Sequence, residues 1–330
     1  MLLVRDLKTY FFTDAGVIKA VDGVSLSVRE GETLAVVGES GSGKSVTGLT
    51  VMGLLARTTA RVMGGSIGFG RRDGTVLELT SIAEAAMQRV RGHDIAMVFQ
   101  DPLSSLNPVF SIGDQIMEPI RIHTGADGRE ARARALALLA QVGISDPEGR
   151  IDDYPHQFSG GMRQRVMIAM ALACDPRLLI ADEPTTALDV TIQAQIVALL
   201  KRLQSERQMA MIFVSHDLKL VSEIASRVAV MYSGQVVEEG AIADVLSRPR
   251  HPYTRALLDC IPSRRDAAGN RRILHPIPGS PPDPLSPPPG CRFHPRCRYG
   301  DDRCRSGDPE LQPVDPTHAT RCLRWREIEL

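Results

Sequence analysis

The segment Gly38–Ser45 reads G-x-x-x-x-G-K-S, which has the residue types and spacing of a loop that binds phosphate groups. Its glycines allow a tight turn, so that successive backbone N–H groups point at phosphate oxygens. Lys44 would reach the β- and γ-phosphates of a nucleoside triphosphate, and the Ser45 hydroxyl would ligate Mg²⁺. The alternative is a Gly/Ser-rich linker that contains a lysine by chance. The predicted binding residues are Gly38, Glu39, Ser40, Gly41, Ser42, Gly43, Lys44 and Ser45.

The elements on either side favour the binding loop over the linker. An apolar run of buried-strand type, Leu34–Val37, precedes the loop, and Val46–Leu55 can form a helix after it. The start of that helix would present its positive dipole end to the same anion. This strand–loop–helix order is the context that the phosphate-binding motif requires.

Two adjacent carboxylates end another apolar strand, predicted within Arg177–Pro184. Asp182 is suited to hold Mg²⁺, and Glu183 points elsewhere, where it could orient or deprotonate an attacking water molecule. A solvated loop could carry the same two acids. The Mg²⁺-binding loop upstream favours the catalytic interpretation.

Gln100 and His216 follow two further buried-strand runs, Ile95–Phe99 and Met211–Val214. The carboxyl ends of parallel strands border the crevice where ligands bind, so both side chains could reach the nucleotide. The alternatives are a solvated loop glutamine and a structural histidine.

Ser159, Gly160 and Gly161 open the apolar helix predicted at Val166–Cys174. Ser159 is a good N-cap, and the two glycines leave the helix end uncovered. This arrangement predicts a second helix start that can bind an anion. An ordinary capped helix is the alternative.

Length and composition indicate a globular protein. The 330 residues predict one large or two modest domains, and 43% hydrophobic residues are enough for a sizeable core. The 39 basic and 39 acidic residues balance, so no global field would steer the chain onto nucleic acid or an anionic membrane. The N-terminus lacks the apolar region of a signal peptide, and the longest apolar run, Val166–Cys174, is too short to cross a bilayer. We therefore expect a cytosolic chain without a nucleic-acid partner.

The remaining segments of the first 248 residues predict strands and helices around these motifs. Residues 1–30 alternate apolar and polar positions, which suits antiparallel strands beside the nucleotide site. In this region Phe11 or Phe12 could stack on an adenine, or both could serve as packing residues. The pattern from Ile112 to about Ile144 is helical, and Val228–Val237 reads as a hairpin.

Taken together, these residues resemble the ATPase subunit of an ABC transporter, because six motifs occur in the order typical of that family. They are Walker A at Gly38–Ser45, the Q-loop at Gln100, the signature motif at Phe158–Met162, Walker B at Leu178–Asp182 followed by the catalytic Glu183, the D-loop at Ala187–Asp189, and the switch histidine at His216. The usual signature is LSGGQ, and this chain has Phe158 for Leu and Met162 for Gln.

A narrower resemblance covers the whole chain. The segments Val98–Pro108, His251–Thr254 and Cys291–Cys297 look like parts of the dipeptide/oligopeptide and nickel importer subfamily. The resemblance implies an α/β P-loop NTPase with a RecA-like, mostly parallel core sheet and an antiparallel N-terminal β subdomain. It implies a nucleotide-binding core at residues 1–100 and 166–248, a helical subdomain with the signature motif at 101–165, and a C-terminal extension at 249–330.

The resemblance also implies a mechanism and partners. Lys44, Ser45 and Asp182 would hold Mg-ATP, with Gln100 sensing Mg²⁺ and the attacking water. Glu183 would position that water, and His216 would contact the γ-phosphate. Ser159, Gly160 and Gly161 of a second ATPase subunit would cap the same γ-phosphate. The expected partners are that second subunit, two transmembrane permease subunits that dock after Gln100, and, indirectly, an extracytoplasmic solute-binding protein. The chain would then lie at the cytoplasmic face of the inner membrane.

The last part of the chain carries a cysteine module. Eight prolines in residues 275–290 predict an extended connector that leads to Cys291, Cys297, Cys304 and Cys322. In a cytosolic chain four close cysteines suggest metal ligation more than disulfides. The spacing leaves zinc and free or oxidised thiols open, and the resemblance to peptide importers implies a [4Fe–4S] cluster. Cys174 and Cys260 are expected to be structural.

Several functions remain open at this point. The favoured function is the ATP-hydrolysing motor of a di-/oligopeptide importer. The same motor could serve nickel or another small solute, because the ATPase subunit does not touch the substrate. An exporter subunit and a non-transport ABC ATPase are further alternatives. The second of these usually has paired cassettes or long insertions, which this single-cassette chain lacks.

Overall fold

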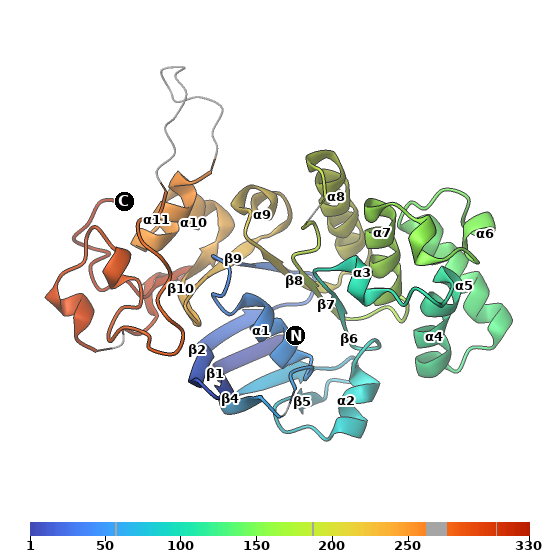
Figure 1. Ribbon diagram of the computed structural model, residues 1–330, viewed down its shortest axis with the longest axis horizontal. Helices are drawn as coiled ribbons and strands as arrows, with labels where there is room; N and C mark the ends of the chain where they lie inside the picture. The colour runs from blue at the N-terminus through green and yellow to red at the C-terminus, as the bar shows by residue number, and fades with distance from the viewer. Residues whose placement is uncertain (57, 187, 262–275, 308) are drawn as a thin grey trace, which may run out of the picture. The chain divides into compact units, whose positions relative to one another are not determined.

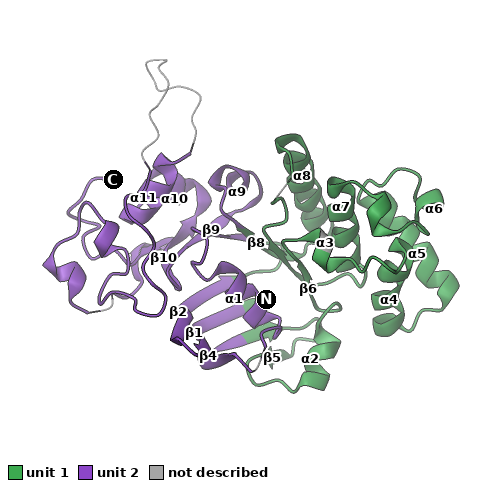
Figure 2. Cartoon of the chain, in the orientation of Figure 1, with its two compact units in different colours: residues 1–2, 28–33, 68–214 green, residues 3–27, 34–67, 215–330 purple. Residues whose placement is uncertain are grey.

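The computed structural model describes residues 1–56, 58–186, 188–261, 276–307 and 309–330 (Figure 1). They form two compact units, each assembled from several segments of the chain (Figure 2). Unit 1 comprises residues 1–2, 28–33 and 68–214, and unit 2 comprises residues 3–27, 34–67 and 215–330. Both units combine strands with helices, as the predicted α/β class requires. The division into a core, a helical subdomain and an extension stays a prediction.

Three parallel strands form the sheet of unit 1, in the order β8 (Ala210–Ser215), β7 (Leu178–Asp182) and β6 (Ile95–Val98). Every residue of these strands is buried, as expected of parallel strands covered on both faces. The register pairs Val98 with Ala181 and Asp182 with Val214, so the carboxyl ends of the strands lie level with one another.

In unit 1, the α-helices from residue 112 onward begin at polar N-caps. The segment predicted to be helical from Ile112 to about Ile144 contains two helices, because Gly125 ends the first in the left-handed region at φ 69°. In Figure 1 the helices α4, α5 and α7 pack side by side. The helices of this unit are α2 (Glu84–Val90), α3 (Pro102–Ser105), α4 (Ile112–Thr124), α5 (Gly128–Gln141), α6 (Pro147–Arg150), α7 (Gly160–Ala171) and α8 (Val190–Arg207).

The sheet of unit 2 is built on β3 (Thr33–Val37), which lies parallel to β9 (Arg227–Tyr232). The predicted hairpin is confirmed: β10 (Gln235–Ala241) pairs antiparallel with β9 through a turn at Ser233 and Gly234, both at positive φ. The helices of this unit are α1 (Lys44–Val51), α9 (Leu218–Ile224), α10 (Ile242–Ser247) and α11 (Pro252–Asp259).

A separate four-stranded sheet contains the first strands of the chain. β1 (Leu2–Thr13) lies between β2 (Gly16–Val28) and β4 (Ala60–Gly70). The end of β4 pairs antiparallel with the short β5 (Val76–Glu78). This agrees with the antiparallel strands predicted from the alternating pattern of residues 1–30.

The C-terminal segment adds strands to the sheet of unit 2. β12 (His318–Thr320) pairs antiparallel with β10, and β11 (Gln312–Asp315) pairs with β12. The carboxylate of the fully buried Glu238 accepts hydrogen bonds from the backbone N–H groups of Arg250 and His251, and it lies 2.7 Å from Nε2 of His318. Of the predicted proline-rich connector, residues 276–290 contain neither helix nor strand, and residue 275 lies outside the described residues.

Two short 3-10 helices, His294–Arg296 and Asp302–Arg305, carry part of the cysteine module. Within the described parts of the chain, every helix is too short or too polar to cross a membrane.

Candidate functional site

The backbone of the loop Gly38–Ser45 approaches neighbouring strands closely at two glycines. Gly38 and Gly43 have φ values of 154° and 101°, which lie in the region that favours glycine. A Cβ at Gly38 would collide with the carbonyl oxygen of Met231, and one at Gly43 with that of Ala20. The two glycines are therefore required by the packing of the loop between β2 and β9.

Polar groups of this loop are arranged to receive phosphate. Lys44 is 5% exposed, and its Nζ donates hydrogen bonds to the carbonyl oxygens of Gly38 at 2.9 Å and Glu39 at 3.0 Å. The buried Ser42 Oγ has no hydrogen-bond partner among the described residues. The N-cap of α1 is Gly43, which offers no side chain to the first N–H groups of that helix. An anion such as a triphosphate would accept a hydrogen bond from the Ser42 hydroxyl at this helix start, so the loop fits the ligand that its sequence predicts.

A cavity of about 490 Å³ adjoins the loop. Phe11, Lys19 and the segment Pro281–Pro284 line it together with the loop. Phe12 does not line this cavity, and the Arg61 guanidinium lies 5.2 Å from the centre of its ring. Phe11 is therefore the better candidate for a nucleotide base contact.

In unit 1 the structure brings two of the predicted catalytic residues together. Nε2 of Gln100, after β6, donates to Oε2 of Glu183 at 3.1 Å, and the Thr186 hydroxyl donates to the same oxygen at 3.0 Å. Glu183 has φ 45°, a left-handed conformation that costs a non-glycine residue about 1–2 kcal/mol. Its N–H donates to the Val214 carbonyl at 3.0 Å, which holds this turn. The neighbouring Asp182 is 6% exposed at the end of β7.

The signature residues begin α7, also in unit 1. Ser159 is the N-cap, and its Oγ accepts from the Met162 N–H at 3.4 Å. Ser159 and Gly160 are exposed, whereas Phe158 is 2% exposed. A Cβ on Gly161 would lie 2.8 Å from a methyl carbon of Ile192, so this glycine permits close packing of α7 against α8. The helix start is therefore presented on the surface of the unit.

His216 follows β8 and belongs to unit 2. Its ring is exposed, and the next residue, Asp217, is the N-cap of α9, accepting from the Lys219 N–H at 2.8 Å. In the predicted D-loop, Ala187 lies outside the described residues. Asp189 of the same motif is the N-cap of α8.

The four C-terminal cysteines line one narrow cavity together with His251. All of them are free thiols, and burial raises the pKa of Cys291 to about 11 and that of Cys322 to about 12. Among the described residues, no three or more His, Cys, Asp or Glu side chains form a group that could hold a metal ion. The structure thus brings the cysteines together but does not confirm the predicted cluster.

The other two cysteines lie elsewhere. Sγ of Cys174 donates to the Pro119 carbonyl at 3.3 Å, and burial raises its pKa to about 11, as expected of a structural thiol.

The sequence did not reveal that the C-terminal segment reaches the phosphate loop. Besides Pro281–Pro284 at the cavity, Tyr253 accepts a hydrogen bond from the Glu39 N–H at 2.8 Å, and Arg296 pairs with the Glu39 carboxylate. The nearest signal in the sequence is the motif His251–Thr254. It indicates a resemblance to a subfamily, but it does not predict which residue its tyrosine contacts.

Comparisons with known proteins agree with these features. The family model "ABC transporter" matches residues 21–186, and "Oligopeptide/dipeptide transporter, C-terminal region" matches residues 237–304. A peptide import ATP-binding protein of Brucella melitensis is 52% identical over 99% of this chain and 98% of its own length. A peptide ABC transporter ATP-binding protein of Sinorhizobium fredii is 48% identical over 99% of this chain and 96% of its own.

A solved structure with a similar fold is a dimer of the ATP-binding cassette MJ0796 bound to ADP and Pi. It has a TM-score of 0.64 and 28% sequence identity, and the match covers 73% of this chain and 99% of the other. A second dimeric structure of the same cassette matches with a TM-score of 0.64 and 27% identity. The predicted P-loop NTPase fold is confirmed by these matches.

Phe11 and Phe12 form a matched pair for testing the base contact. Since stacking of a base on an aromatic ring contributes about 1–3 kcal/mol, Phe11→Ala should weaken ATP binding about tenfold or more. Phe12→Ala, which removes a ring outside the cavity, should change it less than about twofold. Titration with a fluorescent ATP analogue measures both. Equal losses in the two variants would show that Phe11 has no special contact with the base.

Proposed function

The chain belongs to the ABC transporter family and is an ATPase of that family, and from this premise we propose that it is the motor subunit of a di-/oligopeptide importer. The observation that carries the proposal is the whole-length similarity to peptide import ATP-binding proteins, including the C-terminal oligopeptide/dipeptide transporter region. In this role the chain hydrolyses ATP and drives separate permease subunits from the cytoplasmic face of the membrane, to which it binds peripherally.

We assign the binding of ATP to the phosphate loop and Walker B. The loop N–H groups and Lys44 would bind the phosphates, and Ser45 and Asp182 would hold Mg²⁺. When bound there, the ion would supply positive charge that offsets the charge of the phosphates. The buried Ser42 hydroxyl and the uncapped start of α1 support this assignment.

The hydrolytic step is assigned to Glu183. Gln100 and Thr186 both donate to one of its carboxylate oxygens, which orients the carboxylate. A carboxylate held in this way would accept a proton from an attacking water. His216 would contact the γ-phosphate as a hydrogen-bond donor. Gln100 therefore connects the carboxylate of Glu183 with the segment that follows Gln100 in the chain.

A second ATPase subunit is needed to complete each site. The exposed start of α7, with Ser159, Gly160 and Gly161, would cap the γ-phosphate held by the partner. Since ATP would bind the closed pair better than the open pair, it shifts the pair towards closure. The similar cassette MJ0796 forms a dimer, which supports this arrangement.

Glu183→Gln tests the catalytic assignment. The amide keeps the shape of the side chain but cannot take up a proton, so ATP turnover should fall at least about 100-fold. ATP binding and ATP-dependent pairing of subunits should persist. Steady-state phosphate release and size-exclusion chromatography with ATP measure the two properties. Turnover at the wild-type rate would remove Glu183 from this role.

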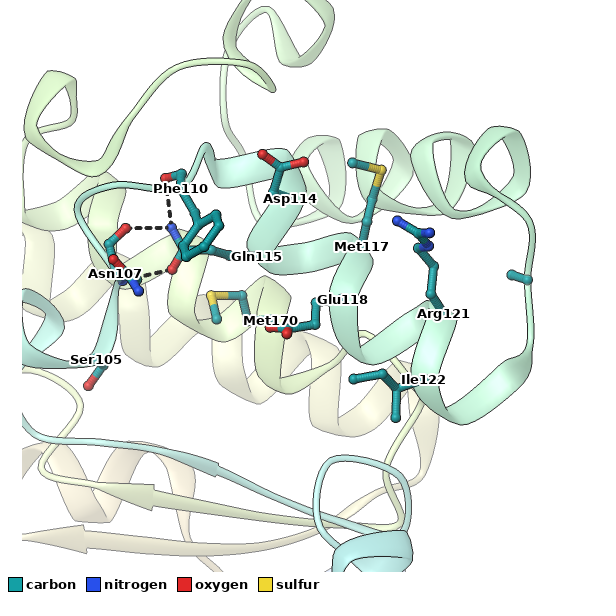
Figure 3. A pocket seen from close by; sticks show the side chains of 11 residues that line it. Ser105, Asn107, Phe110, Asp114, Gln115, Met117, Glu118, Arg121, Ile122 and Met170 are labelled. Atoms are coloured by element: carbon teal, nitrogen blue, oxygen red, sulfur yellow. Dashed lines mark hydrogen bonds between the residues drawn. The ribbon is translucent and has the colours of Figure 1, made fainter.

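The segment after Gln100 offers a surface for a permease subunit. A groove of about 1010 Å³ is lined by exposed apolar side chains, among them Phe110 and Ile122, and by Arg121 and Glu118 (Figure 3). The amide of Gln115, which is 7% exposed, donates to the Asn107 and Phe110 carbonyls and accepts from the Asn107 N–H. These bonds fix the loop at one wall of the groove, so the groove is suited to receive a helix.

Ile122→Asp should prevent this docking, because burying an unpaired carboxylate in an apolar contact is costly. When the chain is co-expressed with its transporter's permease subunits, we expect at least about tenfold less permease to co-purify. The ATPase activity of the isolated chain should not change. Val76→Asp, at a similarly exposed apolar residue on β5, is the control. Unchanged co-purification of Ile122→Asp would exclude the groove as the docking surface.

The transported substrate could also be nickel or another small solute, because the ATPase subunit of such a transporter does not touch the solute. A non-transport ABC ATPase is the different-class alternative. Failure to bind any permease in the experiment above, together with normal ATPase activity, would favour that alternative.

We further propose that the cysteine module binds a [4Fe–4S] cluster. A single metal ion needs its ligands within about 2.3 Å, whereas a four-iron cluster takes one thiolate per iron and so accepts sulfurs that lie farther apart. The donor set fits: four thiols line one cavity, and Nε2 of the buried His251 has no partner among the described residues. Since Nδ1 of His251 accepts from the Tyr253 N–H and burial lowers the pKa of His251 to about 3, Nε2 carries a proton that sulfur could accept.

Anaerobic purification tests the cluster. We expect about four iron atoms per chain and a broad absorption near about 400 nm, both lost in Cys297→Ser. Cys174→Ser, which changes a thiol bonded to a backbone carbonyl, should keep the iron. About one zinc ion per chain, or no metal, would contradict the proposal.

A further inference from the structure

A buried arginine of the C-terminal segment holds the start of the phosphate loop. The Arg296 side chain is 4% exposed, and its two Nη atoms donate to the two carboxylate oxygens of Glu39 at 2.7 Å and 3.1 Å. Nη1 also lies 3.2 Å from the Tyr232 hydroxyl, and Nε donates to the Pro278 carbonyl at 2.8 Å. The fork geometry of the guanidinium therefore fixes both the position and the orientation of the Glu39 carboxylate.

Aromatic rings enclose this ion pair. The rings of Tyr232, Tyr253 and Phe293 lie 4.5 to 5.3 Å apart, and the guanidinium is 5.8 Å from the centre of Tyr232 and 5.9 Å from that of Phe293. Tyr253 also accepts from the Glu39 N–H at 2.8 Å. Glu39 is thus held at its backbone and at its side chain by residues that follow it by more than 200 positions.

The conformation of Glu39 matters because it bears on Lys44. The Lys44 ammonium bonds to the carbonyl oxygens of Gly38 and Glu39, so these two residues set its position. Gly38 is conformationally permissive, and ordering a permissive loop on ligand binding costs entropy. A loop that is already held in place does not pay that cost when ATP binds.

From these contacts we propose that the C-terminal segment contributes to nucleotide binding. Arg296 is a positioning residue in this segment, and it pre-organises the phosphate loop through Glu39. Pro281–Pro284 belong to the same segment and line the same cavity. The inference rests on the proposed role of the loop in binding ATP. The C-terminal segment would then set the affinity for ATP and ADP, while the rate of the chemical step depends on other residues.

The test uses the full chain with Arg296→Gln, Glu39→Gln and the double variant. We expect each single variant to bind a fluorescent ATP analogue about tenfold more weakly and to raise KM for ATP by a similar factor. The kcat should stay within about threefold, because a pre-organised loop favours binding of ground state and transition state alike. The double variant should lose no more than the single ones, since both remove the same interaction.

A conservative variant and two controls separate positioning from stability. Arg296→Lys keeps the charge without the fork, so it should fold and still weaken ATP binding about threefold or more. Arg292→Gln breaks the neighbouring buried pair with Asp22, which ties the same segment to β2, and Arg303→Gln breaks exposed pairs with Asp301 and Glu327. Both controls should keep the affinity for ATP within about twofold.

Two results would overturn the inference: unchanged affinity in folded Arg296→Gln and Arg296→Lys, or an equal loss in Arg292→Gln, which would mean that docking of the segment is all that matters. Thermal unfolding without nucleotide establishes that each variant is folded.

Lys44→Ala distinguishes the proposed phosphate site from the proposed positioning role of Arg296. If it binds ATP normally, the proposed phosphate site is wrong. If it loses ATP binding while the Arg296 variants keep it, only the positioning role of Arg296 is wrong.

Discussion

The close packing of backbone against backbone at Gly38 and Gly43 is the constraint on which the phosphate loop depends. Each glycine lies against a carbonyl oxygen of a neighbouring strand, Met231 of β9 and Ala20 of β2, at a distance that excludes any side chain. The path from β3 into α1 is therefore imposed by strands that are distant in sequence. This path carries the buried hydroxyl of Ser42 and the ammonium of Lys44, the kinds of donor that a polyanion requires.

A change in backbone conformation separates the adjacent acids Asp182 and Glu183 of unit 1. Asp182 ends a fully buried strand, and Glu183, the next residue, takes a left-handed conformation that turns its carboxylate towards Gln100 and Thr186. Adjacent carboxylates in one extended strand would only point to opposite faces of the sheet. The turn at Glu183 instead brings its carboxylate to two hydrogen-bond donors, while Asp182 stays buried at the end of the strand. Residues held in such strained conformations are frequent at catalytic positions.

The sequence predicted the features that depend on local pattern and not those that depend on pairing across the chain. The buried strands β3, β6, β7 and β8 were predictable because runs of four to six consecutive apolar residues between turn signals are typical of buried strands. The pairing of Glu39 with Arg296 joins residues 257 positions apart, and no periodicity records it. The cysteine spacing likewise predicted a module, whereas its cavity with His251 depends on how β10 and α11 fold. The break at Gly125 was also hidden, since both helices share one pattern.

The energetics of the Glu39–Arg296 pair indicate that it fixes the conformation of the phosphate loop. Taking a guanidinium and a carboxylate out of water costs several kcal/mol per ion, and their attraction often does no more than offset this cost. Apolar residues of similar size at the two positions could stabilise the fold as well as the pair does. They could not fix the orientation of a loop backbone, because apolar contacts are non-directional. The bidentate fork does so, and it acts on the peptide groups that hold Lys44. We therefore infer that the Glu39–Arg296 pair serves to hold the phosphate loop in one conformation. It adds little or nothing to the stability of the fold.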